Sequence, residues 1–176
     1  MKDILSRFEI VVGDITRLDV DVIVNAANSR LVPGGGVDGA INKAAGARLG
    51  RAMMAIGRCA EGEAVITPGF GLRASHVIHT VAPVYAQHKP EEVWRLLRLC
   101  YANALAIARG LQVRSIAFPG LGTGAYAIPV EDASKVAVMT VIGHCATENF
   151  PERIVFCCFS EGDADQYRKV IEGLGS

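Results

Sequence analysis

The chain has 176 residues, which suggests one domain spanning residues 1–176, because globular domains run to roughly 100–200 residues. Hydrophobic residues make up 51% of it and charged residues 20%, a composition typical of a folded domain. Eighteen basic residues balance 18 acidic ones. This balance argues against a protein that coats nucleic acid by neutralising phosphates, although it leaves room for a pocket that takes one nucleotide-like ligand.

The five cysteines are odd in number and form no C-x-x-C pair, so neither a disulfide framework nor a zinc site is expected. The charged first ten residues do not resemble a signal peptide. No apolar run reaches the length of about 18 residues that a membrane span needs. We therefore expect a cytoplasmic protein with no metal, no cofactor and no membrane contact.

Apolar runs alternate with helical patterns along the whole chain. Six runs predict strands at Phe8–Val12, Asp21–Ala26, Glu63–Thr67, His76–Val81, Ser115–Phe118 and Ile154–Phe159. Five segments predict helices at Asp38–Ala45, Arg48–Ile56, Glu91–Arg109, Val130–Cys145 and Asp163–Leu174. Strands that are apolar on both faces belong in a covered sheet. The expected fold is a three-layer α/β/α sandwich around a mixed, mostly parallel central sheet.

Ligands bind such sheets at the carboxyl ends of the strands, so the loops that follow strands are the places to look for chemistry. Asp14 follows the first strand, where its carboxylate either accepts a hydrogen bond from an exocyclic amine or caps the next turn. Asn25 and Asn28 follow the second strand. Their amides suit ribose hydroxyls, but asparagines in this position also bond the backbone of tight turns.

Glycines Gly34–Gly36 lie just before a predicted helix. Without Cβ atoms their N–H groups can crowd against an anion, and the free N–H groups of the helix add to the attraction for phosphate. Asp38 is either a first-turn acid favoured by the helix dipole or a general base aimed into the cleft. A second glycine-rich loop, Gly120–Tyr126, follows a later strand. The two loops together could hold a pyrophosphate from both sides.

Neither G-x-G-x-x-G after the first strand nor G-x-x-x-x-G-K-[ST] occurs, which argues against a nicotinamide dehydrogenase or an ordinary ATPase. The sequence instead contains GDIT at 13–16, NAANSRLVPGGGVDGAI at 25–41, HTVAP at 79–83 and GTGAYAIP at 122–129. These motifs resemble a macrodomain, and the asparagine pair followed by GGGVD resembles the MacroD-type branch. The resemblance covers nearly the whole chain.

The resemblance implies a protein that binds ADP-ribose, hydrolyses the ester of O-acetyl-ADP-ribose and removes mono-ADP-ribose from acidic side chains of proteins. A non-catalytic module that only reads ADP-ribose is the alternative. No nucleic-acid partner is expected, because 6% of aromatic residues offers few stacking platforms.

By position, the resemblance assigns adenine to Asp14, to the backbone of Ile15 and to Phe159, and the distal ribose to Asn28 and Tyr126. Asp38 and Asn28 are the implied catalytic residues. The other implied substrate contacts are Asn25, Gly35, Gly36, Val37, Gly122, Thr123, Gly124 and Ala125. Either Asp38 or a substrate phosphate oxygen would activate the attacking water. If Asp38 is the base, replacing it with alanine should remove most turnover and leave ADP-ribose affinity measurable.

Three departures from the family pattern involve four positions. Gly122 stands where many relatives have serine, Ala127 and Ile128 replace a common Gly-Tyr, and Ala82 stands where glycine is frequent. These departures are expected to alter the distal end of the pocket. His76 and His79 are expected to be core or rim residues, because no third metal ligand lies near them.

Overall fold

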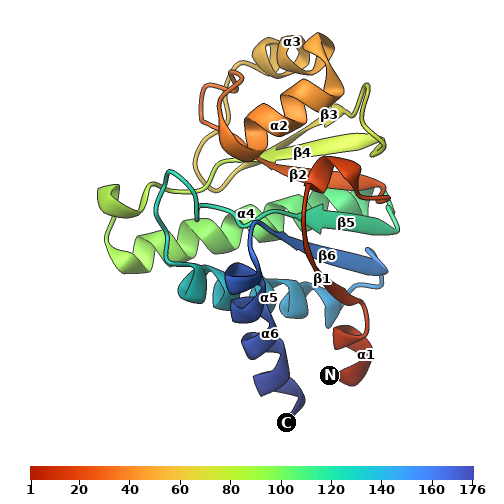
Figure 1. The fold of residues 1–176 in the computed structure, drawn as a ribbon, viewed down its shortest axis with the longest axis vertical. Coiled ribbons are helices and arrows are strands. Elements are labelled where there is room, and N and C mark those ends of the chain that lie inside the picture. The colour runs from red at the N-terminus through yellow and green to blue at the C-terminus, as the bar shows by residue number, and fades with distance from the viewer.

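The computed structural model covers residues 1–176 and contains one six-stranded sheet between two layers of helices (Figure 1). Its strand order is β1-β6-β5-β2-β4-β3. Only β3 pairs antiparallel, with β4, and the other neighbours are parallel. The strands are β1 (Phe8–Val12), β2 (Val22–Ala26), β3 (Ala64–Pro68), β4 (His76–Thr80), β5 (Ser115–Phe118) and β6 (Arg153–Cys158). The predicted mixed, mostly parallel sheet is confirmed.

The five predicted helices are present, with ends that shift by one or two residues. They are α2 (Gly36–Ala45), α3 (Ala47–Ile56), α4 (Pro90–Gly110), α5 (Val130–Cys145) and α6 (Glu161–Gly175). Three short elements were not predicted, because one turn is too short to show an apolar period: α1 (Lys2–Leu5), η1 (Ile15–Arg17) and η2 (Tyr85–Gln87).

Two boundary differences change the site. Helix α2 begins at Gly36, two residues earlier than predicted, and Gly36 itself adopts a φ of +57° that side chains rarely tolerate. Asp38 therefore lies inside the first turn. The last strand ends at Cys158, so Phe159 stands beyond the sheet, where it is 93% exposed.

The sheet buries a separate hydrophobic core on each face. One core of 16 buried residues joins the sheet to α2 and α3, through residues such as Ile41, Leu49 and Met53. The other, of 26, joins it to α4, α5 and α6. Successive side chains of β2 point to opposite faces of the sheet, so Ile23 belongs to the first core and Val22 and Val24 belong to the second. The predicted three-layer sandwich follows from these two cores.

The chain leaves neighbouring strands toward opposite faces. The loop after β2 leads to α2 on one face, whereas the loop after β5, its parallel neighbour, leads to α5 on the other. The loops after β1 and β6, which are also neighbours, diverge toward η1 and α6 in the same way. Such divergence opens a crevice at the carboxyl ends of the strands, and ligands of α/β sheets bind there. The helices of this fold are each too short or too polar to cross a lipid bilayer.

Candidate functional site

The carboxylate of Asp38 holds the first glycine loop in place. Its Oδ2 accepts a hydrogen bond of 2.6 Å from the backbone N–H of Gly34. Its Oδ1 accepts from the side-chain amides of Asn25, at 2.6 Å, and of Asn42, at 3.1 Å. Asp38 is 4% exposed, so both carboxylate oxygens are already occupied by protein donors within a buried setting. This arrangement anchors the loop to the first turn of α2.

A chain of buried hydrogen bonds extends from Asp38 across the sheet. The amide nitrogen of Asn25 lies 3.0 Å from Nδ1 of His79, its register partner on β4. Nε2 of His79 lies 2.8 Å from the hydroxyl of Thr67 on β3. Because the Asn25 nitrogen donates to the carboxylate, His79 must accept at Nδ1 and carry its proton on Nε2. Burial lowers the pKa of His79 to about 4, so the ring is neutral.

The two asparagines predicted to contact substrate both brace the protein in this structure. Asn25 is fully buried beneath the loop. Asn28 is half-buried, and its amide closes a turn by donating to the carbonyl of Val32 at 2.7 Å and accepting from the N–H of Val32 at 3.2 Å. The Asn28 contacts match the turn-forming alternative that the sequence left open, whereas Asn25 bonds the side chains of Asp38 and His79. Their roles toward a ligand stay predictions.

The first glycine loop leaves backbone donors unused. No side chain caps α2, and the N–H groups of Gly36 and Val37 donate to no protein acceptor. A Cβ at Gly35 would meet no atom within 4 Å, and its φ of −96° suits any residue. The fold therefore does not require glycine at Gly35, which indicates that the open space serves a ligand. Gly39 differs, because its Cβ would lie 2.8 Å from the carbonyl of Gly34.

The second glycine loop is fixed on one side and open on the other. The hydroxyl of Thr123 donates to the carbonyl of Gly120 at 2.9 Å, so it supports the loop from within. The N–H of Ile128 donates to the carbonyl of Gly122 at 2.9 Å. Gly124 and Ala125 are exposed, and their N–H groups have no protein acceptor. The two loops thus present unpaired amides after adjacent strands, β2 and β5.

The three departures from the family pattern belong to one packing unit. Gly122 has a φ of +75°, and a Cβ there would collide with the side chain of Ile128 and lie 3.1 Å from the Cβ of Ala82. Ile128 and Ala82 are buried, so they occupy the space that a larger residue at Gly122 would need. Ala127 stands at a φ of +61°, where glycine would be unstrained. These residues therefore fix the shape of the second loop together.

Asp14 and Phe159 follow neighbouring strands, as the N–H of Gly13 donates to the carbonyl of Cys158 at 3.2 Å. Oδ1 of Asp14 caps η1 by accepting from the N–H and the hydroxyl of Thr16. These bonds lower the pKa of Asp14 and keep it an acceptor. Its side chain is exposed, whereas Ile15 beside it is buried. The exposed ring of Phe159 is an uncovered apolar surface at the same end of the crevice.

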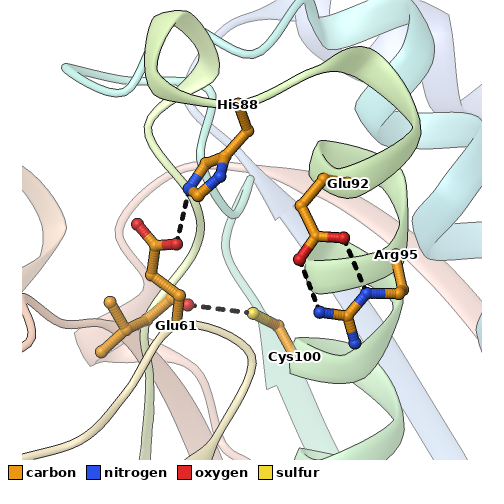
Figure 2. Close-up of polar contacts among 6 residues, drawn as sticks. Glu61, His88, Glu92, Arg95 and Cys100 are labelled. Atoms are coloured by element: carbon orange, nitrogen blue, oxygen red, sulfur yellow. Dashed lines mark hydrogen bonds and ion pairs between the residues drawn. The ribbon is translucent and has the colours of Figure 1, made fainter.

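The loop after β4 braces the second glycine loop from outside. The N–H of Tyr85 donates to the carbonyl of Tyr126 at 2.9 Å, and the half-buried Tyr126 packs against the larger core. Figure 2 shows how this loop is tied down: His88 points toward Glu61, and their side chains lie 2.7 Å apart. Beside them, the thiol of Cys100 donates to the carbonyl of Val81 at 3.3 Å.

Neither a thiolate nor a metal centre is part of this site. Burial raises the pKa of Cys59, Cys100 and Cys157 to about 11 and that of Cys158 to about 12, so these thiols stay protonated. No cluster of three or more His, Cys, Asp or Glu side chains could hold a metal ion.

Sequence reasoning missed Asn42 and Thr67, and it placed His79 only as a core or rim residue. Asn42 lies four residues after Asp38, a spacing that puts both on one helix face, so that pair was detectable. Thr67 gave no signal, because the antiparallel pairing of β3 with β4 that brings it to His79 is a property of the sheet.

Comparison with known proteins gives consistent matches. Residues 24–137 match the family described as the Macro domain. A Macro domain-containing protein of Chlorobaculum tepidum is 49% identical over 90% of this chain and 92% of its own length. A Salmonella typhimurium protein named O-acetyl-ADP-ribose deacetylase is 45% identical over 97% of each chain. The Trypanosoma brucei macrodomain, solved in complex with ADP-ribose, superposes with a TM-score of 0.89 and 36% identity, covering 96% of this chain and 71% of that one.

The neutral His79 makes stability depend on pH. The unfolded histidine, with an ordinary pKa of 6.5, binds a proton before the folded one, whose pKa is about 4. Stability is therefore fully present above pH 6.5 and falls as pH drops toward 4, by about 3 kcal/mol for this residue. His79→Asn keeps an acceptor toward Asn25 but cannot titrate. Urea unfolding at pH 7.0 and 4.5 should show a smaller pH effect in the variant, and equal pH effects would contradict this account.

Proposed function

This chain belongs to the Macro domain family, and on that premise we propose that it binds ADP-ribose and hydrolyses its esters. The reactions are release of acetate from O-acetyl-ADP-ribose and removal of mono-ADP-ribose from acidic side chains of proteins. The Salmonella relative named for the first reaction supports this proposal, as does the Trypanosoma structure that contains ADP-ribose. The observation that carries it is the pair of glycine loops with unpaired amides after β2 and β5.

The pyrophosphate lies between the two loops. The N–H groups of Gly36 and Val37 point from the N-terminus of α2, where the helix dipole adds to the attraction for anions. The N–H groups of Gly124 and Ala125 approach from the second loop, and the open space at Gly35 admits the phosphates without a clash. At the other end of the crevice Phe159 stacks on adenine, and Asp14 accepts a hydrogen bond from its amino group.

These contacts place the distal ribose between Asn28 and Tyr126, so that a water can reach the ester bond. A substrate phosphate oxygen takes the proton of this water, because both oxygens of Asp38 already accept protein hydrogen bonds within a buried pocket. Water oxygen then adds to the ester carbonyl carbon, the bond between that carbon and the ribose oxygen breaks, and the proton held by the phosphate passes to the ribose oxygen. The products are a carboxylic acid and ADP-ribose. General-base help of this kind contributes on the order of 10²–10⁴-fold.

Asp38 acts in this scheme as a positioning residue that holds the first loop. Its role differs from that of a base, because loss of the anchor disturbs ligand binding as well as the chemical step. A reducing, cytoplasmic setting is part of the proposal and is supported by the five buried cysteines, none of which is paired.

Phe159 offers a test of the adenine end. Because its ring is 93% exposed, Phe159→Ala should leave the unfolding free energy unchanged and weaken ADP-ribose binding by about tenfold, the scale of one lost base-stacking contact. Met139→Ala, which removes another exposed apolar side chain on α5, is the matched control and should change neither quantity. Calorimetric titration measures the affinity of both variants for ADP-ribose. Native affinity in Phe159→Ala would remove this residue from the site.

Turnover separates an enzyme from a reader. Wild-type protein incubated with O-acetyl-ADP-ribose should release acetate, followed by mass, and Asp38→Ala should show both a lower kcat and a weaker affinity for ADP-ribose. A pure loss of kcat would instead identify Asp38 as the base itself. Binding of ADP-ribose by the wild type without any hydrolysis would contradict the proposed activity and favour a reader module.

A further inference from the structure

Positive charge is concentrated in one part of a chain whose formal net charge is zero. Between Val22 and Ala60 the only acidic residue is Asp38, which is buried. The same stretch contains five exposed basic residues, which we call the basic surface: Arg30, Lys43, Arg48, Arg51 and Arg58. They belong to the loop after β2, to α2 and α3, and to the segment after α3. Figure 1 shows these helices together at one end of the molecule.

None of these five cations forms an ion pair with an acidic side chain. Elsewhere on the surface several arginines do, as in the pairs Arg153–Glu9 and Arg168–Glu161. The first acids after this stretch are already used, since Glu61 pairs with His88 (Figure 2) and Glu63 accepts a hydrogen bond from the N–H of Ala60. The basic surface therefore keeps an uncompensated positive potential that attracts anionic partners.

This surface includes a pocket beside the proposed reaction site. The pocket has a volume of about 300 Å³ and is lined by Ser29, Arg30, Gly57 and Arg58. Its wall begins at the residue directly after Asn28, and the carbonyl of Ser29 accepts a hydrogen bond of 3.0 Å from the N–H of Cys59. The two sides of the pocket are thus joined. Two guanidinium groups and a hydroxyl match carboxylates, which arginine binds through paired hydrogen bonds.

We propose that the basic surface, through this pocket between Arg30 and Arg58, docks the acidic segment of a polypeptide to which ADP-ribose is attached. The inference rests on the proposed function, which puts the distal ribose next to Asn28 and hence puts the modified side chain within reach of Ser29 and Arg30. Carboxylates that flank the modified residue then bind Arg30 and Arg58. The surface selects acidic protein substrates over free O-acetyl-ADP-ribose.

A polypeptide fits this surface better than a nucleic acid does. The exposed large apolar residues of α3 and of the loop after β2 are Met54, Ile56 and Val32, and none of them is aromatic. Single-stranded nucleic acids are bound through aromatic side chains on which the bases stack. Aliphatic side chains beside arginines suit a peptide in which apolar residues lie among acidic ones.

The test compares two peptides that carry ADP-ribose through a non-hydrolysable linkage, one with acidic and one with neutral flanking residues. Wild-type protein should bind the acidic peptide about tenfold more tightly at low salt, and the difference should shrink as salt screens the charges. Arg30→Glu with Arg58→Glu should abolish the preference and leave the rate of O-acetyl-ADP-ribose hydrolysis within twofold of wild type. Arg98→Glu, on the opposite face in α4, is the matched control and should keep the preference.

Equal binding of the two peptides by the wild type would overturn the proposal, as would a preference that survives the double charge reversal. Tighter binding of a single-stranded RNA oligomer than of the acidic peptide, lost on the same charge reversal, would overturn the assignment to a polypeptide. The binding comparison needs no turnover. Failure of the hydrolase proposal would therefore appear separately, as binding of both ADP-ribosyl peptides without acetate release from O-acetyl-ADP-ribose.

Discussion

The hydrogen bond between the Asp38 carboxylate and the Gly34 amide is the interaction on which the site depends. Three consecutive glycines have more backbone freedom than any other tripeptide, so fixing them costs conformational entropy. A bond of 2.6 Å to a charged acceptor is among the stronger ones in proteins. It holds the loop in one geometry without adding any side chain to the ligand's side. The first glycine loop is therefore rigid, and its ligand-facing side stays open.

The carboxylate itself needs support, because a buried charge without donors is strongly destabilising. Asn25 and Asn42 supply that support, and the neutral ring of His79 orients Asn25 from behind. This chain of contacts links the antiparallel edge of the sheet to the ligand loop. It explains why polar residues occupy the interior of β2 and β4, where apolar ones would otherwise be favoured. It also makes Asp38 an anchor of the loop, and its catalytic role stays a prediction.

The fold and the place of the site were largely predictable from sequence. Apolar strands and amphipathic helices predicted the layers, and the rule that ligands bind at carboxyl ends of strands pointed to the loops after β2 and β5, where the structure leaves backbone amides unpaired. What local pattern could not give was the partner of each polar side chain. The sequence leaves Asp38 as either a first-turn acid favoured by the helix dipole or a general base, and no local pattern identifies the donors that its oxygens meet. The contact of Thr67 with His79 depends on the antiparallel pairing of the edge strand β3, which no spacing of residues in the sequence predicts. Likewise, Gly122, Ile128 and Ala82 lie apart in the sequence as separate departures, and packing makes them one unit.

Amide hydrogen exchange at Gly34 tests the central claim most directly. Gly34 is exposed, so its amide should exchange quickly unless a hydrogen bond protects it. We expect slow exchange in the wild type and fast exchange in Asp38→Ala, while the amides in the middle of α2 keep their protection. Rapid exchange at Gly34 in the wild type, or unchanged protection after the carboxylate is removed, would show that Asp38 does not hold the loop.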